Sequence, residues 1–177
     1  MGGSLSKASI FLINTIFGLY LALLSIRLIL AWERANYFNP VTRFIITLTQ
    51  PIINPLRRIF HNIGSFEVST FLFILLLEGV KLGLITWVGG FAMNVAILAY
   101  SILTETVQLI LATFFFAIFV DVILSWINPH NMPLRQVVGQ IAAPIMRPLR
   151  KLIPTISGFD ISPLIALILI QFLMILI

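Results

Sequence analysis

Residues 49–58, TQPIINPLRR, recur later in the chain as residues 142–151, AAPIMRPLRK. Both stretches contain two prolines four residues apart, and both end on two basic residues. Each stretch lies between two long apolar runs, so the order apolar run, basic proline-rich segment, apolar run occurs twice. A repeat of this kind indicates two copies of one structural unit.

The similarity between the two copies extends beyond these stretches on both sides. Trp32 corresponds to Trp126 and Pro40 to Pro133. Further along, Phe66-Glu67-Val68-Ser69 corresponds to Phe159-Asp160-Ile161-Ser162. The repeat therefore covers most of the chain.

The composition places the chain in a lipid bilayer. Of its 177 residues, 60% are apolar and only 10% are charged, and the mean hydropathy is +1.10. A water-soluble domain of this size could not bury so much apolar surface. The net charge of +5 would suggest nucleic acid as a partner of a soluble protein, but eight of the eleven Lys and Arg residues lie in the two proline-rich segments. Such clustering is typical of charges that orient a membrane protein, so we expect no nucleic-acid partner.

We therefore predict an all-α membrane protein with about four transmembrane helices in two parallel repeats. The first repeat comprises residues 1–88, with spans at 8–32 and 67–88 and an amphipathic loop at 33–66. The second comprises residues 101–177, with spans at 101–126 and 161–177 and an amphipathic loop at 127–160. Residues 89–100 are too few to span a membrane and form an outer-face connector, or extend one of the neighbouring spans.

Four spans put both basic loops on one side of the membrane, which the positive-inside tendency makes the cytoplasmic side. Both termini then lie outside. The alternative of five spans counts residues 82–100 separately and leaves four positive loop charges on each side, which removes the charge asymmetry. We therefore favour four spans.

Each loop carries the pattern of a short amphipathic helix. Apolar residues recur at helical spacing, at Val41, Phe44, Ile45 and Leu48 in the first loop and at Leu134, Val137, Val138 and Ile141 in the second. Pro40 and Pro133 precede these runs, and we expect Pro51 and Pro144 to end them. Such helices should lie in the headgroup plane with the apolar face in the lipid. Beyond them, the spacing of two prolines should prevent a regular helix.

The loops also carry a set of cations that could bind the membrane surface. This basic platform comprises Arg43, Arg57, Arg58, Arg135, Arg147, Arg150 and Lys151. Arginine can bind lipid phosphates in bidentate fashion. The platform either anchors the topology or binds anionic lipids or a membrane protein partner.

Charged residues inside the predicted spans must pair, reach the headgroups or meet water. Arg27 and Asp121 occupy corresponding positions, each five residues or about 7.5 Å before its tryptophan. We therefore predict an Arg27–Asp121 ion pair between the repeats. Glu78 and Lys81 are three residues apart and can neutralise each other on one helix face. Together with Glu105, they form either a locally paired set or a polar path through the bundle.

The sequence offers no catalytic arrangement. It contains no cysteine, and its two histidines, His61 and His130, stand alone in the loops. No nucleophile lies beside a base, and no phosphate-binding or metal-binding motif occurs. We therefore expect neither an enzyme nor a metal site nor a cofactor.

The repeated pattern resembles the YggT family of small bacterial inner-membrane proteins. The matching motif residues are Trp32, Pro40, Pro51, Pro55, Trp126, Pro133, Pro144, Pro148, Pro154, Asp160, Ser162 and Pro163. The chain departs from the family pattern at Asp121, where an arginine is usual, at Ala142, where threonine is usual, and at His61 and Thr70, where prolines are usual.

The resemblance implies a multi-pass protein of the bacterial inner (plasma) membrane, linked to osmotic or salt tolerance and to potassium homeostasis. It also implies, through photosynthetic relatives, a link to membrane-complex assembly. We therefore expect a membrane-organising role for the basic platform. The alternative is a cation channel or a regulator of potassium uptake, which would require a homo-oligomer because four short spans leave little room for a pore.

Overall fold

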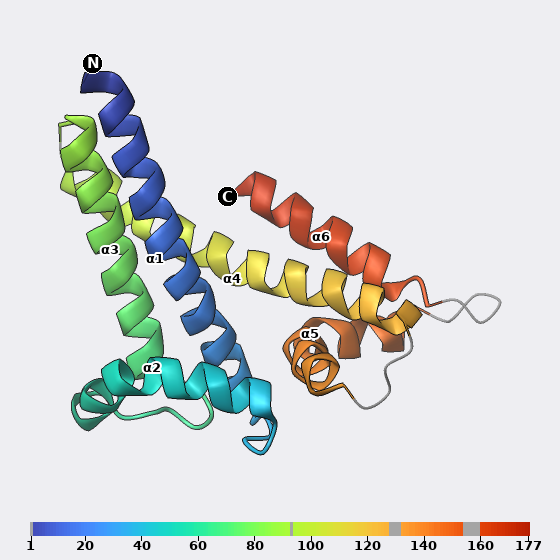
Figure 1. Cartoon of the computed structure of the whole chain (residues 1–177). Coiled ribbons are helices and arrows are strands. Elements are labelled where there is room, and N and C mark those ends of the chain that lie inside the picture. The colour runs from blue at the N-terminus through green and yellow to red at the C-terminus, as the bar shows by residue number, and fades with distance from the viewer. Residues whose placement is uncertain (1, 93, 128–131, 154–159) are drawn as a thin grey trace.

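The computed structural model describes residues 2–92, 94–127, 132–153 and 160–177. These residues form six α-helices, shown in Figure 1: α1 (Gly2–Trp32), α2 (Pro40–Ile59), α3 (Val68–Gly89), α4 (Val95–Ile127), α5 (Pro133–Leu152) and α6 (Ser162–Leu176). The order long helix, amphipathic helix, apolar helix occurs twice. The protein is therefore an all-α membrane protein, as the composition predicts.

Three helices are long and apolar enough to cross a membrane. They are α1, from Ser4 to Trp32, α3 and α4. The fourth predicted span, residues 161–177, forms the shorter apolar helix α6 of 15 residues. At 1.5 Å per residue, α6 extends about 22 Å, which is less than a typical hydrocarbon core.

The connector between the repeats is much shorter than residues 89–100. Gly90 ends α3 in the left-handed conformation (φ 68°), and its N–H donates to Thr86 O and Trp87 O. Asn94 then begins α4, since its Oδ1 accepts from the N–H groups of Ala96 and Ile97. Residues 95–100 thus extend the third span, and the five-span alternative is wrong because the turn interrupts residues 82–100.

The amphipathic helices do not end at their first internal prolines. Pro40 and Pro133 begin α2 and α5 as expected, but Pro51 and Pro55 lie inside α2, and Pro144 and Pro148 lie inside α5. Each proline removes one backbone donor, and two prolines four residues apart place both losses on one face. The helices bend instead of ending, and each changes direction along its length in Figure 1.

The apolar faces of these helices turn largely towards the protein rather than towards lipid. In α5, Val137, Val138 and Ile141 are buried in a core shared with α1, α4 and α6. In α2, Ile45 is buried, whereas Phe44 and Leu48 remain exposed. The prediction that both apolar faces enter the lipid is therefore wrong for α5 and holds for only part of α2, because much of each apolar face packs against the spans instead.

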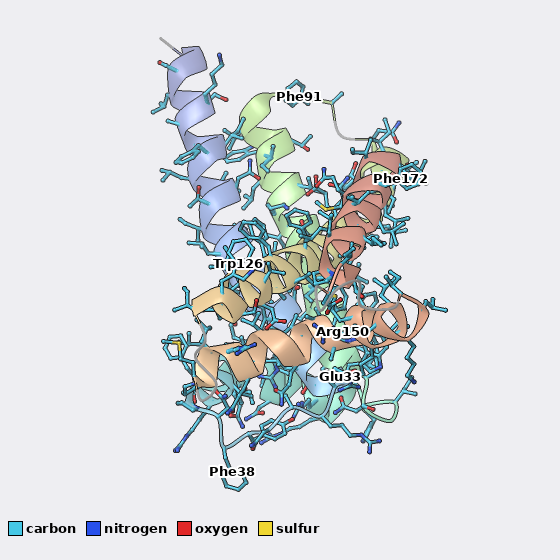
Figure 2. All side chains as sticks on the ribbon, turned by 90° about the vertical axis from the view of Figure 1, so that its right-hand side faces the viewer. Glu33, Phe38, Phe91, Trp126, Arg150 and Phe172 are labelled. Atoms are coloured by element: carbon cyan, nitrogen blue, oxygen red, sulfur yellow. The ribbon has the colours of Figure 1, made fainter. Side chains whose placement is uncertain are left out.

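The two amphipathic helices lie at the same end of the molecule. Figure 1 shows α2 and α5 below the pairs α1/α3 and α4/α6, with the turn between α3 and α4 at the other end. In Figure 2, Phe38, which precedes α2, and Phe91, in the turn after α3, lie at opposite ends. Ser25 of α1 and Thr113 of α4 share a hydrogen bond between the two repeats.

Because α2 and α5 lie at one end of the molecule, positions on both helices should be accessible to a reagent from the same side of the membrane. The chain contains no cysteine, so single-cysteine variants R58C, K151C and F91C need no further changes. A membrane-impermeant maleimide should modify R58C and K151C from one side of the membrane and F91C from the other, as measured in intact spheroplasts and inverted vesicles. Labelling of R58C and K151C from opposite sides would contradict this arrangement.

Candidate functional site

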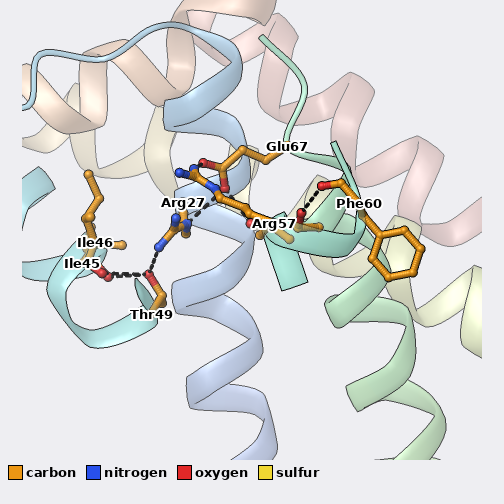
Figure 3. A network of polar contacts seen from close by, with 9 residues as sticks. Arg27, Ile45, Ile46, Thr49, Arg57, Phe60 and Glu67 are labelled. Carbon is orange, nitrogen blue, oxygen red and sulfur yellow. Dashed lines mark hydrogen bonds and ion pairs between the residues drawn. The ribbon is translucent and has the colours of Figure 1, made fainter. Parts of the chain in front are cut away.

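A buried arginine at the lower end of α1 organises the first repeat. Arg27 Nε donates to Glu67 Oε2 at 3.0 Å, and its Nη1 donates to Thr49 Oγ1 at 2.7 Å, as Figure 3 shows. The side chains of Arg27 and Glu67 are only 3% and 4% exposed. These contacts tie together α1, α2 and the start of α3.

Two further side chains complete the coordination of the Glu67 carboxylate. Arg57 Nη2 from the end of α2 donates to Glu67 Oε1. Thr70 Oγ1 donates to Glu67 Oε2 at 2.5 Å. Burial, together with the nearby charge of Arg27, lowers the pKa of Arg57 below its ordinary value. We call Arg27, Thr49, Arg57, Glu67 and Thr70 the first clasp.

The local backbone explains why Glu67 reaches this position. Ile63 and Phe66 exchange two backbone hydrogen bonds across a tight turn in which Gly64 has a φ of 61°. Ser69 Oγ then donates to the carbonyl oxygen of Phe60 at 2.8 Å, which joins the start of α3 to the end of α2 (Figure 3). The turn thus returns the chain beneath α1.

The predicted Arg27–Asp121 ion pair is wrong. Arg27 takes its carboxylate from its own repeat, and Asp121 lies against α5, with its Oδ1 3.9 Å from the position that a Cβ at Gly139 would occupy. Equal depth does not bring the two residues together, because each faces the amphipathic helix of its own repeat.

The second repeat contains a reduced version of the clasp. Arg150 Nε donates to Asp160 Oδ2 at 2.8 Å, and these residues correspond to Arg57 and Glu67. Their side chains are 53% and 34% exposed, so this pair is much more accessible to water. Burial raises the pKa of Asp160, but hydrogen bonding from Ser162 and the contact with Arg150 outweigh burial and lower it overall. We call Arg150 and Asp160 the second clasp.

Direct contacts join the two amphipathic helices. Asn39 begins α2, with its Oδ1 accepting from Val41 N at 2.9 Å, and its Nδ2 donates to the carbonyl oxygen of Pro133 at 2.8 Å. Glu33, just after α1, pairs with Arg147 of α5 at 3.0 Å. These contacts hold the start of the first amphipathic helix and the segment before it against the second amphipathic helix.

Only part of the predicted platform is available to an external ligand. Arg57, Arg147 and Arg150 are held by internal carboxylates. Within residues 2–92, 94–127, 132–153 and 160–177, four other platform cations have no ion pair. They are Arg43, Arg58, Arg135 and Lys151. Internal pairing therefore divides the platform into structural and free cations.

A second charged group lies inside the spans, away from the clasps. Lys81 Nζ lies 2.5 Å from Glu78 Oε2 on the same helix and 3.5 Å from Glu105 Oε2 on α4. The Glu78–Lys81 pair is the one that their spacing indicates, and Lys81 also joins α3 to α4. The three side chains and Gln108 line a cavity of about 220 Å³.

Comparison with known proteins identifies the group to which this arrangement belongs. The CCB3/YggT family profile matches residues 6–88 and 100–177. The chain belongs to the CCB3/YggT family. An uncharacterised protein of Pseudomonas aeruginosa is 38% identical over 168 residues, which cover 92% of the chain and 84% of that protein. The uncharacterised protein YggT of Escherichia coli K12 is 32% identical over 160 residues, which cover 90% and 84%, respectively. No solved structure matches the chain significantly.

The motif residues of this YggT-family chain mostly mark helix boundaries. Trp32 and Trp126 lie in the last turns of α1 and α4 and are exposed, as interface anchors would be. Ser162 and Pro163 begin α6. Pro154, like the isolated His130, lies outside the described residues.

Sequence reasoning missed the partner of Arg27 in this family member. The repeat includes Glu67 and carries a signal for its pairing with Arg57, because an arginine precedes an acid by ten residues in both copies. No duplicated pattern marks its contact with Arg27, because Asp121 stands at the equivalent position. Thr49, Asn39 and Glu33 had no such duplicated signal. Their roles depend on how the helices pack.

The two clasps predict unequal effects of equivalent substitutions. E67Q should lower the free energy of unfolding by about 3 kcal/mol or more, since it leaves Arg27 buried without a counter-charge. The equivalent D160N should cost less than about 1 kcal/mol, because the pair that it breaks is exposed. Denaturation in mixed micelles would measure both values, and equal losses would show that burial does not distinguish the two clasps.

Proposed function

We propose that this chain is a non-enzymatic membrane-organising protein whose joined amphipathic helices hold anionic lipid at the cytoplasmic face of the bacterial inner membrane. The observation that carries the proposal is the placement of Arg43, Arg58, Arg135 and Lys151, which are free of internal ion pairs among the described residues, on two helices at one end of the molecule. A role in osmotic or salt tolerance belongs to this proposal through the family resemblance.

The exposed side of α2 supports binding at the membrane surface. Phe44, Leu48 and Ile52 are spaced by four residues and are 60%, 45% and 40% exposed. A helix with an exposed apolar stripe and adjacent cations is suited to the headgroup region. Each cation near an anionic surface contributes about 1 kcal/mol, so four free cations together give a substantial preference.

The rigidity of the surface favours an organising role over simple anchoring. The Asn39–Pro133 hydrogen bond holds the start of α2 against the start of α5, and the Glu33–Arg147 ion pair holds the segment between α1 and α2 against α5. The first clasp holds α2 against the spans. Anchoring the membrane topology requires only that the platform cations be present. The hydrogen bonds and ion pairs described above also fix the positions of these cations relative to one another. A fixed array of cations can gather several lipids or dock one partner protein.

The platform proposal predicts a lipid preference that native tryptophans can report. In a W87F background, the remaining Trp32 and Trp126 lie at the platform ends of α1 and α4. Brominated phosphatidylglycerol should quench their fluorescence more strongly than brominated phosphatidylcholine. The variant R43Q/R58Q/R135Q/K151Q should make the two lipids quench about equally.

K7Q is the control, because Lys7 lies near the opposite end of α1. It should leave the lipid preference unchanged. A phosphatidylglycerol preference that persists in the quadruple variant would rule out the platform as its source.

A second function, cation conduction or regulation by a homo-oligomer, is favoured by the charged group inside the spans. Glu78 and Glu105 share the single Lys81, which leaves an excess negative charge beside a cavity of about 220 Å³. Charged groups at such depth are costly unless they are paired or functional.

The conduction proposal predicts potassium flux in proteoliposomes that depends on this group. E78Q should abolish the flux, because it removes the buried acid of the cavity. D121N should leave it unchanged, since Asp121 does not line that cavity. Wild-type protein that shows no ion-selective flux would exclude this function, and E78Q protein that conducts normally would exclude the charged group as its basis.

A further inference from the structure

A cavity of about 330 Å³ adjoins the first clasp between α1 and α2. Its polar lining comprises Arg27, Tyr37, Thr42, Gln50, Arg57 and Glu67. The remainder of the wall is apolar. The clasp therefore forms one side of a partly open space with polar and apolar walls, which neither the free platform cations nor the charged group in the spans lines.

Several hydrogen-bond donors at this cavity lack a partner. Thr42 is fully buried, and its hydroxyl has no hydrogen bond within the part of the chain that the structure describes. The same is true of Arg57 Nε. Arg27 uses its Nε and Nη1 on Glu67 and Thr49 and retains further N–H groups. Since buried polar groups are normally satisfied, the cavity calls for a ligand that accepts hydrogen bonds.

The charge of the lining points in the same direction. Two guanidinium groups face one carboxylate, and both oxygens of Glu67 already accept bonds from Arg27, Arg57 and Thr70. One positive charge therefore remains without a counter-charge. Water could bond to the Thr42 hydroxyl, but it would leave this charge uncompensated.

We propose that this cavity binds a phosphate group, carried by an anionic phospholipid or by free phosphate. Arginine presents several donors in a planar fork that matches phosphate oxygens. A monoanionic phosphodiester would balance the remaining charge and accept from Thr42, Arg57 and Arg27 together. The site differs from the platform, whose free cations do not line the cavity, and the inference does not rest on the platform function.

The second repeat lacks the equivalent site. Arg27, Thr42 and Gln50 correspond to Asp121, Arg135 and Ala143. The matching pocket, of about 460 Å³, lies between α4 and α5. It is lined by these three residues together with Gln136, Gly139, Gln140 and Arg147. A carboxylate thus replaces the buried guanidinium, and we assign one phosphate site to each chain.

Thr42 allows a test that does not disturb the clasp. T42V keeps the shape of the side chain and removes the unpartnered hydroxyl, so the ligand-free protein should be as stable as wild type or more stable. T42S retains the hydroxyl. T47V is the matched control on the same helix, because the Thr47 hydroxyl is exposed and donates to the carbonyl oxygen of Arg43 on its own helix.

The full chain in an uncharged detergent is titrated with three probes, and its thermal unfolding is followed by tryptophan fluorescence. The probes are dihexanoyl phosphatidylglycerol, dihexanoylglycerol and inorganic phosphate, with chloride keeping the ionic strength constant. Binding to the folded state raises Tm with ligand concentration. Phosphatidylglycerol alone raising Tm identifies a lipid headgroup, and inorganic phosphate raising it identifies the free ion.

In either case, T42V should need about tenfold more ligand for the same shift, because it loses a hydrogen bond to a charged group. T42S and T47V should bind like wild type. The proposal is overturned if neither phosphate-bearing probe shifts Tm, if dihexanoylglycerol shifts it equally, if T42V binds normally, or if T42V lowers the stability of the ligand-free protein. The platform variant R43Q/R58Q/R135Q/K151Q should retain the shift, so failure of one proposal leaves the other standing.

Discussion

The burial of Arg27 is the constraint on which the first repeat depends. An uncompensated guanidinium among apolar helices costs several kcal/mol, so the chain must bring an anion to it. Glu67 supplies that anion, and it can do so only if the chain returns beneath α1 after α2. The course of α2, the tight turn before α3 and the position of Thr49 therefore follow from one requirement. The clasp also leaves cationic donors facing a cavity, so the same constraint that holds the repeat together provides the proposed phosphate site.

Duplication preserved the architecture while the two copies acquired different chemistry. Both copies keep an arginine near the end of the amphipathic helix and an acid ten residues later, and both make that ion pair. In the second copy, Asp121 stands in place of the buried arginine, and Ala142 in place of its threonine partner. With no cation to neutralise, the second clasp remains near the surface. The face of α5 that has no buried arginine to contact packs against α4 and α6 instead. As a result, α5 is the more buried of the two amphipathic helices.

The prolines explain how these helices serve both the bundle and the membrane surface. A straight helix can present one face, but a bent helix can follow the ends of two spans and still direct cations outward. Pro51 and Pro55 are both exposed, so the missing hydrogen bonds lie on the outer side of α2. The bend lets Thr49 reach Arg27 while Arg57, two turns further on, reaches Glu67. The bend therefore allows α2 to make both contacts.

The sequence by itself determined the membrane class, the duplication, the starts of α2 and α5 at prolines, and the Glu78–Lys81 pair, because these depend on composition and on spacing within one helix. Only the tertiary structure decided which carboxylate neutralises Arg27. Asp121 and Glu67 are both plausible partners until it is known which neighbouring segment the Arg27 side of α1 contacts. It also decided that the prolines bend α2 and α5, since a proline ends a helix unless packing on the opposite face holds the helix together. The division of the platform into paired and free cations likewise depended on contacts such as Glu33–Arg147, which join residues far apart in the chain and leave no periodic signal.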